Sequence, residues 1–350
     1  MKRFLFGMDA EQPGDCARLL RRKGIDAVVL GDADARTREA LAENGLMLYL
    51  CYGAHGLGGD FTDPVHLARD AEGREARWFS SGCPNDAALA RARMDAALER
   101  AANLPEVRGI LVDGARFASF ASTEGPDGFF SCFCPRCMER MEALGLDAAR
   151  IRGAVRRLGS ERRITDEAAI ADWFAFRADC VGAYLEDFAG RVHALPGNPE
   201  AGAFVFAPSL AGFVGQTARA CAPLDLVSPM LYRAYPHADG PACLGHEWAA
   251  ASRLFEPEVL RRLAELSGAD AGFVPRQEPD ALLAKGFAPE RVGAEIAAVR
   301  LRPGQSLLPI LQIEDRQIMR SVCSALEAGA DGFGYFMYGQ APLEALPEFF

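Results

Sequence analysis

Eight short apolar runs, separated by longer amphipathic stretches, constrain the fold of this chain more than any other feature. Each run is almost continuously apolar and is bounded by Gly, Asp or Pro, which is typical of parallel strands buried on both faces. The predicted strands are Arg3–Asp9, Ile25–Leu30, Leu46–Tyr52, Val107–Asp113, Gly202–Ala207, Leu224–Tyr232, Ser306–Ile313 and Gly332–Tyr338. Eight strand-then-helix units favour the α/β class and a closed (β/α)8 TIM barrel.

The stretches between these runs show helical periodicity. Clear examples are Pro13–Lys23, Ala35–Asn44 and Asp86–Ala102. Gly24 and Gly45 follow the first two, where a helix end favours a left-handed residue. The alternative fold is a doubly wound open sheet, but no G-x-G-x-x-G fingerprint follows the first predicted strand. The barrel is therefore the preferred prediction.

Three connections are too long for simple turns, at residues 53–84, 115–197 and 233–305. All three leave the carboxyl ends of predicted strands, the face on which barrel enzymes build their active sites. The second and third read as helical insertions after the fourth and sixth strands. These insertions either form the walls of a substrate-binding site or are additional helices that pack around the barrel. We predict a single domain over residues 1–350 with these insertions.

The net charge of −10 argues against a nucleic-acid partner. Such partners require clustered Lys and Arg, whereas the Arg residues here stand singly among acidic residues. No stretch approaches the ~20 apolar residues that cross a bilayer, and the apolar N-terminus is too short for a signal peptide. We expect a cytoplasmic protein with a small-molecule ligand. The sequence is compatible with a homo-oligomer.

Three of the ten cysteines, Cys132, Cys134 and Cys137, follow C-x-C-x2-C spacing. A short turn can aim their sulfurs at one tetrahedral ion, and Cys83 can supply the fourth ligand because adjacent loops of a barrel are neighbours. Four thiolates leave no open position for water, so we predict a structural zinc. The alternative is four unrelated buried thiols. The remaining cysteines read as small core residues: Cys16, Cys51, Cys180, Cys221, Cys243 and Cys323.

These motifs resemble those of the family-42 β-galactosidases, which are retaining (β/α)8-barrel glycoside hydrolases. That family carries Cys-Pro-Asn after its third strand and C-[YF]-C-x2-C after its fourth, and the four thiols bind zinc. Here the matching elements are Cys83-Pro84-Asn85 and residues 132–137. The resemblance covers roughly residues 1–145 by motif and the whole chain by architecture, and it implies the fold and the zinc ligands.

The chain departs from that family at the end of its fourth predicted strand. The family has an Asn-Glu pair there, and its Glu is the catalytic acid/base. In this sequence Gly114 and Ala115 follow Asp113 at that place. The family acid/base is missing, so β-galactosidase activity does not carry over.

Glycoside hydrolysis generally needs two carboxyl groups, and those at the carboxyl ends of barrel strands can meet at the axis. Our candidates for the catalytic pair are Asp113 and Glu314; the resemblance places the family nucleophile at the seventh strand, where Glu314 lies. The alternatives are structural: Asp113 can pair with Arg116, and Glu314 and Asp315 can cap the following helix.

Sugar sites also need flat apolar surfaces and polar hydrogen-bonding groups. Candidates of both kinds follow the predicted strand ends. We predict as substrate-binding residues Asp9, Glu11, Tyr52, His55, Arg116, Tyr232, Gln312, Asp315 and Tyr338.

The predicted function is hydrolysis of a small glycoside or oligosaccharide. The alternative from another class is a catalytically inactive sugar-binding or scaffold barrel derived from a glycosidase, which the missing Glu would explain. A Schiff-base aldolase is disfavoured, because the lysines are Lys2, Lys23 and Lys285 and none stands at a strand end. A carboxyl separation of about 5 to 5.5 Å would indicate retention and about 6.5 to 9.5 Å inversion.

Overall fold

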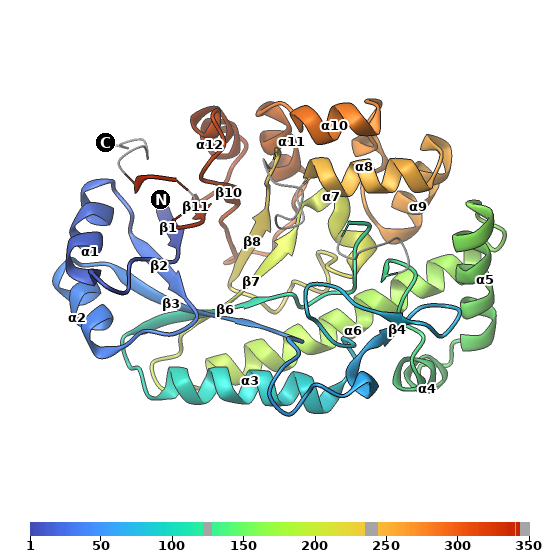
Figure 1. Ribbon diagram of the computed structural model, residues 1–350, viewed down its shortest axis with the longest axis horizontal. Helices are drawn as coiled ribbons and strands as arrows, with labels where there is room; N and C mark the ends of the chain where they lie inside the picture. The colour runs from blue at the N-terminus through green and yellow to red at the C-terminus, as the bar shows by residue number, and fades with distance from the viewer. Residues whose placement is uncertain (122–127, 235–243, 340, 344–350) are drawn as a thin grey trace.

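Parallel strands form one sheet that closes on itself in the computed structural model, which describes residues 1–121, 128–234, 244–339 and 341–343 (Figure 1). The barrel strands are β1 (Lys2–Phe6), β2 (Ala27–Leu30), β3 (Met47–Gly53), β6 (Val107–Asp113), β7 (Glu200–Phe206), β8 (Leu226–Met230), β9 (Ser306–Leu307), β10 (Ile310–Gln312) and β11 (Gly332–Phe336). Strand β1 pairs with both β2 and β11, which closes the sheet.

Strands β9 and β10 are two parts of one barrel strand. Pro309 lies between them and has no N–H to donate to a sheet ladder. Both parts nevertheless pair with β8, at Val227↔Leu307 and Ile310↔Met230. The barrel therefore has eight strands among the described residues, and the predicted (β/α)8 fold is confirmed.

Helices surround this barrel. Those before β7 are α1 (Pro13–Arg22), α2 (Ala35–Glu43), α3 (Ala87–Ala102), α4 (Pro135–Ala143), α5 (Ala148–Glu161) and α6 (Glu167–His193). Those after β7 are α7 (Pro208–Ala211), α8 (Leu244–Leu254), α9 (Pro257–Ser267), α10 (Pro279–Lys285), α11 (Glu290–Ala298) and α12 (Ile318–Glu327). Asp residues cap several of them; Asp86, for example, accepts a hydrogen bond from the Leu89 N–H at the start of α3.

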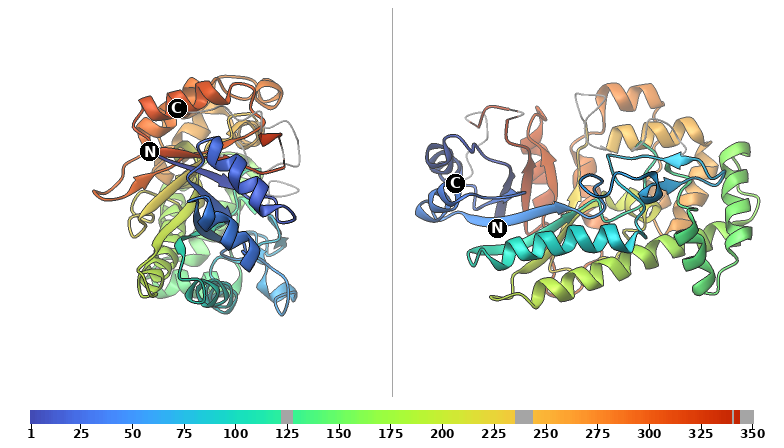
Figure 2. Two further views of the ribbon diagram at one scale, coloured as in Figure 1. Left: turned by 90° about the vertical axis from the view of Figure 1, so that its left-hand side faces the viewer. Right: turned by 60° about the horizontal axis from the view of Figure 1, so that its bottom comes forward.

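The long connections supply most of the extra helices. Helices α4–α6 lie between β6 and β7, and α8–α11 lie between β8 and β9. The connection after β3 holds a small hairpin of β4 (Ala68–Arg69) and β5 (Glu75–Ala76). In Figure 1 this hairpin, α4, α5 and α8–α10 occupy the right half of the molecule, whereas α1 and α2 lie on the left. Figure 2 shows the two long helices, α3 and α6, side by side along the barrel.

Aromatic and aliphatic side chains fill the barrel interior. This inner cluster includes Phe4, Val29, Tyr49, Leu111 and Phe204, and it is separate from the larger cluster between strands and helices. At the amino end of the barrel, Glu200 accepts hydrogen bonds from Lys2 Nζ at 2.9 Å and from Tyr49 Oη at 2.7 Å. This half-buried polar group closes the bottom of the barrel.

Several local predictions agree with the structure. Strand β6 has the predicted bounds Val107–Asp113. Gly24 and Gly45 have φ values of 76° and 64°, in the left-handed region that glycine adopts without steric cost. Among the described residues, no helix has the length and apolar character needed to cross a membrane.

Candidate active site and metal centre

Aromatic rings form the floor of the barrel's carboxyl end. The Phe6 and Phe336 ring centroids lie 5.3 Å apart, and Phe336 also lies 5.4 Å from Tyr232. Phe6 and Phe336 belong to the inner cluster but are only partly buried. Because polar groups close the opposite end, we infer that solvent reaches these rings from the carboxyl end.

Asp113 ends strand β6 at this level. Residues two apart on a strand face the same side, and Leu111 belongs to the inner cluster. The Asp113 side chain therefore also faces the barrel axis. The side chain is accessible to solvent, yet protein surrounds it closely enough that desolvation raises its pKa. The Arg116 guanidinium opposes this shift of the pKa. A carboxyl group with a raised pKa is a better proton donor near neutral pH.

Glu314 lies just beyond the end of strand β10. The Gln312 side-chain amide donates a hydrogen bond of 3.1 Å to its carboxylate. Gln312 is buried, and its Oε1 has no hydrogen-bond partner in the described part of the chain. Glu314 itself is half-buried and so can meet a ligand. The strand end thus presents a fixed carboxylate beside an unpaired buried acceptor.

Asp315 is engaged in a buried ion pair instead. The Arg233 Nε lies 2.7 Å from one carboxylate oxygen, and its Nη2 contacts the other. Both side chains are less than 10 % exposed. Asp315 also accepts hydrogen bonds from the Gln317 N–H and the Ser321 hydroxyl. Asp315 therefore joins the segments that follow β8 and β10. The N-cap residue of α12 is Gln317 and not Asp315.

Asp9 and Tyr338 lie together where β1 leaves the barrel. The Asp9 carboxylate accepts hydrogen bonds from the backbone N–H groups of Gln12 and Glu11, and these bonds, with a further one from Tyr338, lower its pKa. Asp9 therefore shapes the turn before α1. The Glu11 side chain is exposed.

Tyr52 and His55 face the helical layer. Tyr52 Oη lies 2.9 Å from Tyr184 Oη on α6, and the His55 ring packs against the Tyr184 ring at 5.1 Å. His55 is buried, and desolvation lowers its pKa to about 4. On β3, Cys51 and Gly53 face the barrel axis, so Tyr52 faces outward. Tyr52 and His55 therefore lie on the helical side of the sheet, away from Asp113.

The sequence reasoning did not identify the aromatic residues around Arg116. The Arg116 guanidinium lies 4.6 Å from the Trp78 ring, 4.3 Å from the Phe206 ring and 6.0 Å from the Phe79 ring. Trp78 is buried, whereas Phe79 is 52 % exposed. Phe79 and Ser80 have φ values of 42° and 52°, which bulky L-residues rarely adopt. The sequence feature that could have indicated these residues is the adjacent pair Trp78-Phe79 in a long loop with several glycines.

Four buried thiols form the clearest constellation outside the barrel mouth. The sulfur atoms of Cys83, Cys132, Cys134 and Cys137 all lie within 4.8 Å of one another. Cys83 Sγ is 3.5 Å from the sulfurs of Cys134 and Cys137 and 3.6 Å from that of Cys132. Tetrahedral Zn–S bonds of about 2.3 Å would place the sulfurs about 3.8 Å apart. The four thiols could therefore bind a metal ion, as predicted from their spacing.

Polar hydrogens surround these sulfurs. The Asn85 side-chain amide donates to Cys137 at 3.2 Å, its backbone N–H to Cys83 at 3.3 Å, and the Arg69 backbone N–H to Cys132 at 3.4 Å. Cys134 also precedes the first residue of α4, so the positive end of that helix faces the cluster. All of these groups stabilise thiolates.

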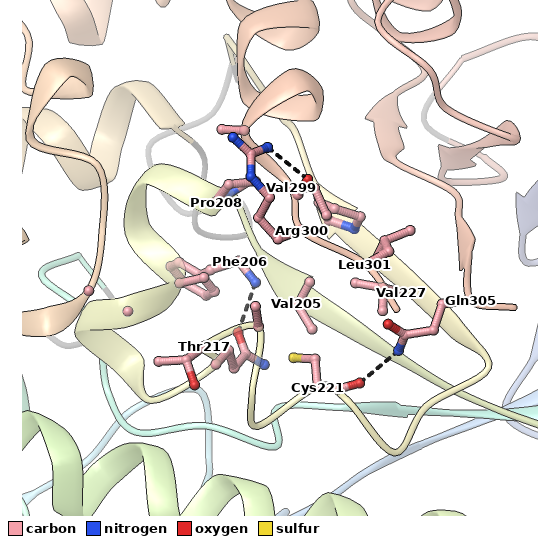
Figure 3. Close-up of a pocket in the computed structure, with 17 residues that line it drawn as sticks. Val205, Phe206, Pro208, Thr217, Cys221, Val227, Val299, Arg300, Leu301 and Gln305 are labelled. Carbon is pink, nitrogen blue, oxygen red and sulfur yellow. Dashed lines mark hydrogen bonds between the residues drawn. The ribbon is translucent and has the colours of Figure 1, made fainter. Parts of the chain in front are cut away.

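The other cysteines are mostly buried, as predicted. The prediction is wrong for Cys323, which is exposed on α12, and Cys243 lies outside the described residues. Cys221 lines a separate cavity of about 170 Å³ on the outer surface of β7 and β8 (Figure 3). The connection between those strands contains only the short α7 and a 3-10 turn, Gly212–Val214, which leaves Val205 and Val227 partly uncovered by helix.

This side cavity does not provide a catalytic set. Its lining is largely apolar, and burial raises the pKa of Cys221 to about 12, which disfavours a reactive thiolate. Gln305 and Gln216 line it too, but both side chains bond to backbone groups, at 3.0 Å for Gln305 Nε2 to the Cys221 carbonyl oxygen. The candidate active site remains the carboxyl end of the barrel.

Comparison with known proteins identifies the class at the level of the fold: a (β/α)8 barrel of the kind found in glycosidases. The barrel is similar to the β-galactosidase of the psychrophilic Marinomonas ef1, with a TM-score of 0.59 and 14 % identity over 98 % of this chain and 55 % of that one. It is similar to the β-galactosidase of the Antarctic haloarchaeon Halorubrum lacusprofundi, with a TM-score of 0.56 and 14 % identity over 97 % and 53 %.

A catalytic mutant of Gan42B, a GH42 β-galactosidase from G. stearothermophilus, aligns with a TM-score of 0.52 and 11 % identity over 95 % of this chain and 51 % of that one. The chain thus spans about half the length of these enzymes. No family model matches it, and no curated protein matches it. The resemblance to family-42 barrels predicted from the cysteine motif is confirmed for the fold.

Proposed function

We propose that this protein is a glycoside hydrolase that acts on a small glycoside or oligosaccharide at the carboxyl end of its barrel. The observation that carries the proposal is that Asp113 ends β6 and Glu314 follows β10 by two residues, so both lie at the carboxyl end of one closed barrel, which also carries partly exposed aromatic rings. Gln312 adds a buried acceptor that a sugar hydroxyl would satisfy. The glycosidase fold of the similar structures supports the same class.

Asp113 is the better candidate for the acid. Desolvation raises its pKa, so it holds a proton at a higher pH than an ordinary aspartate does. That proton would pass to the glycosidic oxygen as the bond from the anomeric carbon to that oxygen breaks. Glu314, as a carboxylate, would attack the anomeric carbon or take a proton from the attacking water. Phe79 and the barrel-floor rings would stack on the sugar.

The cysteine cluster would hold a structural zinc. Four thiolates saturate a tetrahedral ion, so the metal would brace the loops after β3 and β6 and would not bind water. The nine described cysteines are free, which fits a reducing cytoplasm. Metal analysis of protein purified without added metal should find about one zinc per chain.

The test is a mass-spectrometric screen against glycosides and oligosaccharides, run with Asp113→Asn and Glu314→Gln. Cleavage by the parent that both folded variants lose, with Asp95→Asn on the surface of α3 as an active control, is the expected result. Either variant cleaving as fast as the parent would refute the assigned pair.

The second candidate is a sugar-binding barrel without catalysis. Gly114 and Ala115 favour it, because they replace the Asn-Glu pair of the similar family. Binding of a sugar without turnover by the parent, weakened in the same two variants, would support this function instead.

A further inference from the structure

A buried guanidinium lies beside the cysteine cluster. Arg177, in the middle of α6, is 0 % exposed. Its Nη1 donates a hydrogen bond of 2.7 Å to the Phe213 carbonyl oxygen, and its Nη2 contacts the carbonyl oxygens of Phe129 and Ser131. The guanidinium also lies 3.9 Å from the Trp173 ring. These partners are all neutral.

Such an arrangement requires a source of negative charge. Within the described ranges, no carboxylate forms an ion pair with Arg177. A buried cation without a counter-charge is strongly destabilising. An arginine guanidinium stays protonated in proteins at neutral pH, so this buried group carries a positive charge.

The cysteine cluster supplies that charge when it holds a metal. Four thiolates and one divalent cation carry a net charge of −2. Ser131, whose carbonyl oxygen accepts from Arg177, immediately precedes the ligand Cys132. The guanidinium thus approaches the centre from the side of α6. Arg136 on α4 is a second cation near the sulfurs, but it also pairs with Asp86 at 3.1 Å.

We propose that Arg177 is the internal counter-charge of a metal–tetrathiolate centre and the residue that positions its ligand segment, residues 129–132. This inference rests on the metal proposed above for the four cysteines. It concerns the retention of the ion and is independent of any hydrolase activity.

The same side chain ties the centre to the loops of the barrel mouth. Phe213 belongs to the 3-10 turn after β7, and the next residue, Val214, accepts a hydrogen bond of 3.0 Å from the Phe117 N–H in the segment after β6. A Cβ added at Gly215 would lie 2.6 Å from the Arg177 carbonyl oxygen, so the turn packs directly on α6. Arg177 is therefore a positioning residue that connects three segments.

The test compares the parent with Arg177→Met, which keeps an unbranched apolar side chain in place of the arginine stem but removes the guanidinium and its charge. Zinc content after purification and the rate of zinc transfer to the chelator 4-(2-pyridylazo)resorcinol are the readouts. We expect roughly 10- to 100-fold weaker zinc retention, the usual effect of losing a residue that supports metal ligands. Arg177→Lys, which keeps the charge, should recover most of that loss.

Leu185→Ala is the matched control, since Leu185 is a fully buried residue of the same helix. It should lower the unfolding midpoint without changing the zinc transfer rate. Equal rates for Arg177→Met and Leu185→Ala would overturn the inference. Arg177→Gln replaces the Met variant if that variant does not fold, with the same expected change. A parent protein that neither contains nor takes up zinc would overturn the metal proposal and this inference with it.

Discussion

Gln312 and Glu314 form a hydrogen-bonded pair at the end of one barrel strand, with 3.1 Å between the amide nitrogen and the carboxylate oxygen. Gln312 has the same parity on β10 as the inward-facing Ile310, and Glu314 follows in the turn after that strand. The amide therefore orients the carboxylate and keeps its own oxygen available to a ligand. This pairing couples Gln312 directly to the candidate nucleophile or base.

Replacement of Gln312 by Met should lower the catalytic efficiency more than it lowers the free energy of unfolding. We expect kcat/KM on a cleaved glycoside to fall by about 10- to 100-fold, because a buried hydrogen bond to a charged group contributes ~1.5–3 kcal/mol. The free energy of unfolding should change less, because the variant also removes a buried oxygen that has no partner, and this gain offsets part of the lost hydrogen bond. Kinetics and urea unfolding measure the two effects. A parallel loss of activity and stability would contradict the assigned role.

Replacement of Phe79 by Gly should raise the stability of the protein and weaken its binding of a sugar. Its φ of 42° is strained for a side chain with a Cβ, so Phe79→Gly should stabilise the protein by ~1 kcal/mol while weakening sugar binding several-fold. Ser80→Gly is the control, because it relieves similar strain at a φ of 52° without removing a ring. Isothermal titration and urea unfolding provide the measurements. Unchanged sugar affinity in Phe79→Gly would exclude the ring from the site.

The raised pKa of Asp113 should appear in the pH dependence of stability. A carboxyl whose folded pKa lies above its ordinary value of 3.8 contributes stability that is present below that value and is lost as pH rises through the folded pKa. Asp113→Asn removes this loss. Its stability relative to the parent should therefore increase as the pH rises above the ordinary value of 3.8.

Asp166→Asn is the opposite case for the same experiment. The hydrogen bond from Arg150 lowers the pKa of Asp166, so its carboxylate contributes stability above the ordinary value that is lost as pH falls through the folded pKa. The Asn variant should be the less stable protein at neutral pH. Urea midpoints across the pH range distinguish the two signs. The same sign for both variants would contradict the raised pKa of Asp113.

The Arg233–Asp315 pair should be structural. Asp315→Asn leaves a buried guanidinium without its counter-charge, which typically costs about 3–5 kcal/mol. The double variant Arg233→Met/Asp315→Asn should recover most of this loss, as measured by a double-mutant cycle in urea. Full stability of Asp315→Asn combined with loss of sugar binding would instead make Asp315 a ligand-binding residue.

The sequence predicted the features that depend on local patterns. The apolar run Val107–Asp113 and the spacing of Cys132, Cys134 and Cys137 were sufficient for a strand and a metal cluster. The orientation of Tyr52 was not predictable in this way, because a strand that is apolar on both faces does not reveal which residues point inward. The partner of Asp315 lies 82 positions away, and only closure of the barrel brings Arg233 to it.

Ala115 bears on how this barrel could change over evolutionary time. It is 1 % exposed within the outer apolar cluster, and its carbonyl oxygen accepts a hydrogen bond from Gln216. A glutamate placed at this position would bury its carboxylate in the protein interior instead of presenting it to a substrate. A single codon change therefore cannot create an accessible acid at this place. Any variant that acquired such an acid would have to remodel the path of the backbone after β6 as well.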